Sequence, residues 1–117
     1  MSVNKVILLG RVGKDPDMRY PQPGQTMATF TLATNERFPT GNGNETTERV
    51  EWHNVVTWGR NAEIVERYVR KGTQMYVEGK LRTRLWEDRN QIKRYVTEVY
   101  ADIIEVLGRG GGETNAR

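Results

Sequence analysis

The chain has 117 residues, a formal net charge of +3 and a hydrophobic content of 36%, which suits a single small domain. It contains no cysteine, which excludes disulfides, thiolate nucleophiles and zinc–thiolate sites and suits a reducing cytosol. Ser2 is the only serine and His53 the only histidine, so a Ser-His-acid triad cannot be assembled. We therefore expect a protein that is not an enzyme and needs no metal or cofactor, although a carboxylate-bound Mg²⁺ stays formally open.

The apolar residues are few, so we expect a partner subunit to cover part of the apolar surface. The longest apolar run near the start, residues 6–9, is far too short for a signal sequence or a membrane span. We expect no association with a membrane.

The first half of the chain predicts three strands. Residues 4–12 form a short apolar run, and the prolines and glycine of residues 15–24 predict turns after it. Residues 27–34 alternate apolar and polar side chains, as a strand with one buried face does. Residues 39–47 are polar and predict a mobile hairpin tip, after which residues 50–58 form the third strand.

A helix is predicted next, because apolar side chains recur at helical spacing over residues 62–69. Asn61 is the expected N-cap. Arg70 and Lys71 are expected in the last turn, and Gly72 is the expected C-terminal stop.

Two long strands follow the predicted helix. Residues 73–86 form the fourth strand, with Gly79 marking a bulge or a sharp bend. Residues 87–91 form a turn, and the β-branched residues of 93–106 form the last strand.

This order of elements predicts a mainly all-β protein with the OB-fold, a five-stranded Greek-key barrel with one helix between strands 3 and 4. We expect the barrel domain to span residues 1–107 and residues 108–117 to form a flexible, Gly-rich C-terminal stub. OB barrels bind oligonucleotides, proteins or sugars, so the fold by itself does not decide the function.

The fourth predicted strand carries the most informative pattern, because side chains on a strand alternate between two faces. Residues 80–94 contain six cations and two acids. A basic strand can simply be a solvated edge. Here, however, a tryptophan lies on the same face as the cations, and a cationic track that ends in an aromatic ring suits a phosphate backbone with an unstacked base. That face carries Lys80, Arg82, Arg84 and Trp86.

The third predicted strand places Trp52 and Trp58 on one face, together with Val50 and Val56. Taken alone, that face reads equally well as barrel core, where tryptophans are commonly found. Together with the cationic strand, it predicts a surface on which nucleobases stack.

Several motifs resemble, in the same order, those of the bacterial single-stranded DNA-binding protein family. The resemblance covers about residues 3 to 108 without large gaps. It is carried by NKVILLG at 4–10, DP at 15–16 with RY at 19–20, LAT at 32–34, EWHNVV at 51–56, KG at 71–72 and VEGKLRTR at 77–84.

The resemblance implies that single-stranded DNA stacks its bases on Phe38, Trp52, Trp58 and Trp86. Phe38 stands where many relatives carry tryptophan, and Trp58 where many carry phenylalanine. The resemblance further implies a homotetramer in the bacterial cytoplasm, at the nucleoid, with His53 and Tyr76 in subunit contacts. The phosphate contacts that it implies are Lys5, Arg60, Lys71, Arg82 and Arg84.

One departure concerns the C-terminal end. Relatives usually carry a long flexible segment with an acidic tip that recruits replication and repair proteins, whereas this sequence ends at residues 110–117 without one. We expect either a truncated sequence or a natural lack of the tip. Alternatives to DNA binding are an RNA-binding OB module, a primosome-type adaptor whose barrel contacts proteins, and an OB-fold nuclease, which would need clustered acids in the groove.

Overall fold

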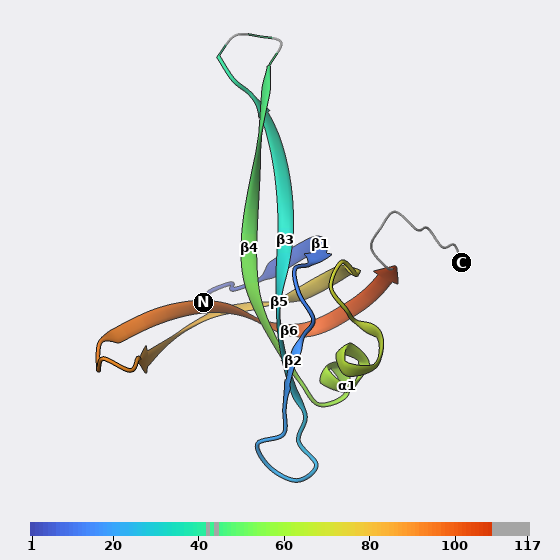
Figure 1. Cartoon of the computed structure of the whole chain (residues 1–117), viewed down its shortest axis with the longest axis vertical. Helices are drawn as coiled ribbons and strands as arrows, with labels where there is room; N and C mark the ends of the chain where they lie inside the picture. The colour runs from blue at the N-terminus through green and yellow to red at the C-terminus, as the bar shows by residue number, and fades with distance from the viewer. Residues whose placement is uncertain (42, 44, 109–117) are drawn as a thin grey trace.

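The computed structural model describes residues 1–41, 43 and 45–108 and shows a sheet that closes on itself (Figure 1). The sheet order is β1-β5-β6-β4-β3-β2, and β1 also pairs with β3. Closure therefore joins the five long strands into a barrel, and the predicted OB-fold is confirmed. The elements are β1 (Val6–Val12), β2 (Asp17–Arg19), β3 (Met27–Pro39), β4 (Thr46–Trp58), α1 (Gly59–Tyr68), β5 (Gln74–Glu87) and β6 (Lys93–Gly108).

The barrel core consists of aliphatic side chains and one phenylalanine. In the first part of β3 every second residue is buried, namely Ala28, Phe30 and Leu32, which confirms the alternation predicted there. The helix α1 connects β4 to β5 and packs against β3, β4 and β6, at the end of the barrel away from the β3–β4 hairpin tip (Figure 1). The buried cluster is Val12, Ala28, Phe30, Leu32, Val55, Ala62, Val65, Val69, Met75, Val77 and Val99.

Strands β3 and β4 extend beyond the barrel as a long hairpin (Figure 1). Their antiparallel register runs from Met27 opposite Trp58 to Pro39 opposite Thr46. Both strands are longer than predicted, because polar residues continue the backbone pairing after the apolar alternation has ended. The connection between the two strands is therefore shorter than the predicted tip and spans residues 40–45. Two of these residues, Asn42 and Asn44, lie outside the described residues.

Strand β2 was missed by the sequence analysis, which predicted only turns in this segment. It pairs antiparallel with β3, with Asp17 opposite Thr29 and Arg19 opposite Met27. The helix is therefore preceded by four strands rather than three, although the barrel itself is the predicted one. The pairing places Arg19 beside the first residues of β3.

The predicted N-cap at Asn61 is wrong. Trp58 is the N-cap, without a side-chain hydrogen bond, and the helix begins at Gly59, which has a φ of 65°. The Asn61 side chain instead donates Nδ2–H to the carbonyl oxygen of Asp102 at 3.0 Å, so it ties the helix to β6.

The helix also ends earlier than predicted, at Tyr68, and Arg70 and Lys71 lie beyond its last turn. Arg67 is the basic residue of that turn. The predicted stop at Gly72 is wrong, because the C-cap is Val69 in an extended conformation. Gly72, with a φ of 89°, lies in the turn that follows, in which the N–H of Thr73 donates to the carbonyl oxygen of Arg70 at 3.0 Å. Its own N–H donates to the carbonyl oxygen of Val12 at 2.8 Å.

The predicted bulge at Gly79 is confirmed by a register shift between Glu78 and Gly79 in the β5–β6 ladder. Strand β6 continues to Gly108, and the rest of the predicted C-terminal stub, residues 109–117, lies outside the described residues. The one helix within the described residues is too short to cross a membrane.

Candidate nucleic-acid interface

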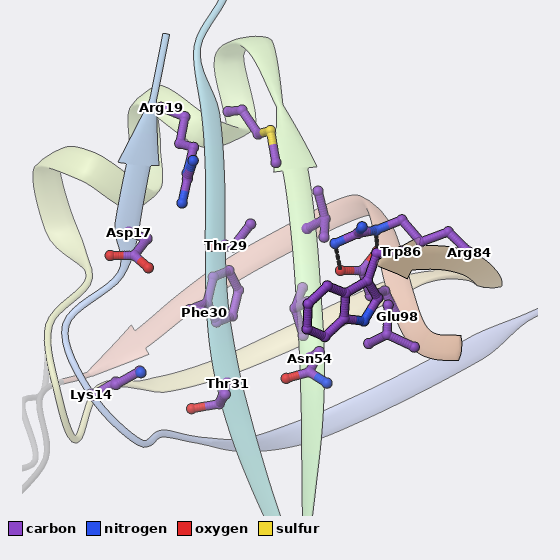
Figure 2. A pocket seen from close by; sticks show the side chains of 14 residues that line it. Lys14, Asp17, Arg19, Thr29, Phe30, Thr31, Asn54, Arg84, Trp86 and Glu98 are labelled. Carbon is purple, nitrogen blue, oxygen red and sulfur yellow. Dashed lines mark hydrogen bonds and ion pairs between the residues drawn. The ribbon is translucent and has the colours of Figure 1, made fainter. Parts of the chain in front are cut away.

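A groove of about 630 Å³ crosses β3 and β4 between β2 on one side and the β5–β6 hairpin on the other (Figure 2). Thr29, Thr31 and Asn54 contribute polar groups to its floor, beside the buried Val56. We call this hollow the groove. Its rims carry Lys14 and Arg19 near β2, and Arg84 and Trp86 on β5.

The strand register aligns the two tryptophans of β4 along this floor. Trp52 lies opposite Ala33 at one end and Trp58 lies opposite Met27 at the other. Asn54 and Val56 occupy the same face between them. Trp52 is 58% exposed and Trp58 is 44% exposed, so neither side chain belongs to the barrel core.

Gly13 leaves space for the Trp52 indole. A Cβ atom at position 13 would lie 2.4 Å from Cζ3 of Trp52. The backbone at this point is fixed, because the N–H of Gly13 donates to the carbonyl oxygen of Thr31 at 3.0 Å. The glycine therefore lets the Trp52 ring approach the backbone of the loop after β1 closely.

A second hollow adjoins the groove at Trp58. Met18, Tyr20 and Pro21 line it together with Met27, which also lines the groove. Trp58 is therefore accessible to a ligand that leaves the groove at the end of β2.

Phe38 is not brought into the groove. It pairs with Thr47 on the β3–β4 hairpin, on the face opposite to that of Trp52. Its ring is partly covered by Arg49, whose Cζ lies 5.4 Å from the ring centroid. A nucleic-acid ligand that reaches both Phe38 and Trp52 must pass around the edge of the β3–β4 hairpin.

The predicted alternation of β5 is present. Thr83 on one face contacts Thr97 of β6, with 3.0 Å between the hydroxyl oxygens. On the other face, Cζ of Arg82 lies 5.1 Å from the centroid of the Tyr100 ring. Trp86 is 42% exposed at the end of this face and lines the groove.

Arg84 is engaged by Glu98 from the neighbouring strand β6. Its Nε donates to Oε1 of Glu98 at 3.1 Å and its Nη2 donates to Oε2 at 3.2 Å (Figure 2). The hydrogen bonds and the negative charge of Glu98 raise the pKa of Arg84 above its usual value. Arg84 therefore enters the groove as half of an ion pair.

The other predicted phosphate contacts lie outside the groove. Arg60 is exposed on the first turn of α1, and Lys80 is exposed at the start of the β5 cationic face. Lys71 lies after α1, where its backbone N–H donates to Oδ1 of Asp15 at 2.8 Å. Lys5 forms an ion pair with Glu78, with 3.0 Å between Nζ and Oε1.

Several groove residues were not identified from the sequence. Asn54 could have been found, because it lies between Trp52 and Val56 in the alternation of β4. Arg19 depends on the pairing of β2, and no periodic pattern indicated that pairing. No sequence pattern indicated that Glu98, which lies among the β-branched residues of β6, belongs to the groove.

The two residues expected in subunit contacts lie in different places. Tyr76 is on the outer face of β5, where its hydroxyl donates to Oε2 of Glu78. This bond raises the pKa of Tyr76, and together with Lys5 it lowers the pKa of Glu78. His53 is half-buried on β4, with 2.9 Å between its Nε2 and Oγ1 of Thr34.

The side of the β1–β5–β6 sheet that faces away from the barrel core, which we call the outer face, carries apolar side chains interspersed with charged ones. Tyr76 lies on it between Leu9 of β1 and Glu105 of β6. In the ladders, Leu9 lies beside Tyr76, and Ile7 lies beside Glu78 and then Ile103. Each of these apolar side chains is about half exposed. The set is Ile7, Leu9, Ile103 and Leu107.

Within residues 1–41, 43 and 45–108, no three side chains of His, Cys, Asp or Glu are grouped so that they could hold a metal ion. The acids nearest the groove are Asp17 on its rim and Glu98, which is paired with Arg84. The clustered acids that a nuclease interpretation requires are therefore absent from the described part of the groove.

Residues 3–107 match the Single-strand binding protein family. The chain is 50% identical to the Single-stranded DNA-binding protein of Bacteroides thetaiotaomicron, over 99% of this chain and 73% of that protein. It is 44% identical to Single-stranded DNA-binding protein 1 of Chlorobaculum tepidum, over 97% and 72% of the two chains.

A solved structure described as the Plasmodium falciparum SSB complex with ssDNA is similar to the fold described above. Its TM-score is 0.83 at 37% identity, over 92% of this chain and 97% of that chain. The matched family model and the two relatives cover almost all of the described barrel, and the predicted resemblance is confirmed. The chain belongs to the Single-strand binding protein family.

Proposed function

We propose that this protein binds single-stranded DNA with little sequence preference and protects it during replication, recombination and repair. One observation carries the proposal: three tryptophans are exposed at or beside a groove with cationic rims. Trp86 lines the groove, Trp58 lines the adjoining hollow, and Trp52 lies on the same face of β4 as the groove residue Asn54. Apolar surface that is exposed together in this way marks a site of interaction. Every base has a face that stacks on an indole, which explains the sequence tolerance.

Stacking and charge contribute separately to binding. Each base stacked on an indole contributes about 1–3 kcal/mol, and one barrel covers about 4–16 nucleotides. Lys14 and Arg19 lie on the rim, where the phosphates of a DNA strand in the groove would pass. Arg82 and Lys80 continue the cationic face of β5 beyond the groove and would contact phosphates next along that strand. Their contribution weakens with salt, with a slope of about −0.7 for each neutralised phosphate.

The remaining predicted contacts define a longer path outside the groove. A DNA strand that continues along the β3–β4 hairpin reaches Phe38. One that passes along α1 reaches Arg60 at the start of the helix and Lys71 beyond its end. Lys5 must first leave its ion pair with Glu78 before it can contact a phosphate. We assign all four to DNA that wraps around the barrel.

The stacking assignment is tested by Trp52→Ala and Trp86→Ala. We expect each variant to bind an oligo-dT strand more weakly by about 1–3 kcal/mol at matched salt, because one stacked base is lost. Tryptophan fluorescence titrated with oligo-dT, and with a duplex of equal length, gives the affinities. The duplex should bind poorly, since its bases are already stacked on one another.

Tyr95→Ala is the matched control, because Tyr95 is 77% exposed on β6 but does not line the groove. It should bind oligo-dT as the unaltered protein does. If both tryptophan variants also bind like the unaltered protein, the stacking assignment is wrong. A matched RNA strand that competes better than the DNA would favour the RNA-binding alternative.

The outer face supports the second part of the proposal, a homotetramer. Ile7, Leu9 and Ile103 expose apolar surface next to Tyr76, although the chain is poor in hydrophobic residues. Exposed apolar side chains gathered on one face, here with Glu78 and Glu105 between them, are typical of a protein interface. His53 contributes a subunit contact on the resemblance alone. We place the assembly in the cytoplasm, at the nucleoid, and assign it binding rather than catalysis.

A further inference from the structure

We propose that Glu98 is a positioning residue, which holds Arg84 as a reader of nucleobase edges instead of leaving it as a phosphate contact. The inference rests on the proposed binding of single-stranded DNA and reassigns one residue of that site. Three observations carry it: the two-fold hydrogen bonding of the pair, the position of Glu98, and the donors that Arg84 keeps free.

The pair is fixed by two parallel hydrogen bonds between strands. Nε and Nη2 of Arg84 bond to the two carboxylate oxygens of Glu98, at 3.1 and 3.2 Å. Glu98 is only 8% exposed, and its backbone belongs to the paired region of β6, so the carboxylate cannot turn away easily. The Arg84 side chain is 55% exposed. A buried carboxylate thus orients an accessible guanidinium.

The pair removes one positive charge from the groove. Arg82 lies two residues earlier on the same face of β5 and serves as a reference. Its guanidinium lies over the Tyr100 ring, and no carboxylate lies within ion-pairing distance of it in the described part of the chain. Glu98 lies opposite Arg82 in the β5–β6 ladder, but its carboxylate forms its ion pair with Arg84. A phosphate is therefore attracted more strongly to Arg82 than to Arg84, where it meets a neutral pair with an adjacent carboxylate.

Arg84 keeps three of its five N–H donors for a ligand. A guanidinium carries one N–H on Nε and two on each terminal nitrogen, and Glu98 accepts one from Nε and one from Nη2. The two N–H groups at the outer edge, one on Nη1 and one on Nη2, point in parallel directions. This fork matches two adjacent acceptors on a base, such as O6 and N7 of guanine.

Trp86 and Asn54 complete a site for one base around this fork. Figure 2 shows the Trp86 indole beside the Arg84–Glu98 pair, facing Asn54 across the groove floor. A base that stacks on Trp86 presents its edge to Arg84. Cytosine offers the adjacent acceptors O2 and N3, whereas thymine has an N3–H between its two carbonyl groups. We therefore expect the subsite to favour cytosine or guanine over thymine.

The first test is the salt dependence of oligo-dT binding in three variants. Arg82→Met should make the slope shallower by about 0.7, because one phosphate contact is lost. The double variant Arg84→Met, Glu98→Gln removes both charges of the pair. It should leave the slope unchanged although it weakens binding. Glu98→Gln should make the slope steeper by about 0.7, because the unpaired guanidinium then attracts a phosphate.

The second test compares oligo-dC with oligo-dT of equal length. Arg84→Met should weaken oligo-dC binding about fivefold more than oligo-dT binding, which is the lower end of what a bidentate base contact discriminates. Arg82→Met should weaken both to the same extent. Glu98→Gln should reduce the difference between the two strands as Arg84→Met does.

Two results would overturn the inference. One is a loss of slope in the double variant Arg84→Met, Glu98→Gln equal to that in Arg82→Met. The other is an equal effect of Arg84→Met on oligo-dC and oligo-dT. If the variants that carry Glu98→Gln fail to fold, the comparison of the two strands decides alone, since Arg84 is exposed. An unaltered protein that binds neither strand would instead overturn the proposed function and the inference with it.

Discussion

Gly79 shows how one missing side chain fixes the bend of β5. A Cβ atom at this position would lie 2.1 Å from the carbonyl oxygen of Tyr100, a backbone atom that cannot move without breaking the β5–β6 ladder. We expect Gly79→Ala to lower the free energy of unfolding by about 1–3 kcal/mol, the usual cost of overpacking. Urea denaturation measures this loss.

Gly41→Ala is the matched control for that measurement, because a Cβ atom at position 41 meets nothing within 4 Å. The control should unfold like the unaltered protein. Equal stability of Gly79→Ala and Gly41→Ala would show that the bulge can absorb a methyl group.

At the scale of elements, alternation of side chains predicted the strands wherever one face is buried. It located the buried half of β3, where Ala28, Phe30 and Leu32 face the core. Alternation could not predict the part of β3 after Thr34. Both faces of the hairpin are solvated there, so the sequence shows no periodicity. The three residues of β2 are too few to show any period.

The candidate site was predictable only where the alternation within a single strand placed its residues. The alternation of β5 predicted Arg82, Arg84 and Trp86 on one face, since their spacing is a property of a single strand. The pairing of Arg84 with Glu98 was not predictable, because it depends on the register between β5 and β6. Phe38 was placed by the resemblance, and the register of the hairpin puts it on the opposite face from Trp52.

The β5–β6 hairpin depends on one carboxylate at its turn. Oδ1 of Asp88 accepts the N–H groups of Asn90 and Ile92, and Oδ2 accepts Nε–H of Arg94 at 2.9 Å. These bonds, that of Arg94 above all, lower the pKa of Asp88 below its usual 3.8. The stabilisation is therefore present above pH 3.8 and is lost as the pH falls through the lowered value.

Asp88→Asn tests this dependence. The variant should be less stable than the unaltered protein at neutral pH, because the bond to Arg94 loses its charge. The difference in unfolding free energy should shrink as the pH falls below 3.8, because the carboxyl of the unfolded chain then takes up a proton. It should stop shrinking below the lowered pKa of the folded protein, where the native carboxyl is protonated as well. Denaturation measured across this range gives the difference, and a constant value would contradict the role of the Asp88 charge.

For the whole molecule, the groove and the outer face are separate surfaces, so assembly can be altered without touching a stacking residue. Leu9→Glu removes about 2 kcal/mol of apolar burial for each copy and adds a charge that must be desolvated, so association should weaken by well over the tenfold that about 1.4 kcal/mol represents. Leu85→Glu, equally exposed but outside the outer face, should keep the mass of the unaltered assembly in light scattering. Equal masses for both variants would remove the outer face from the interface.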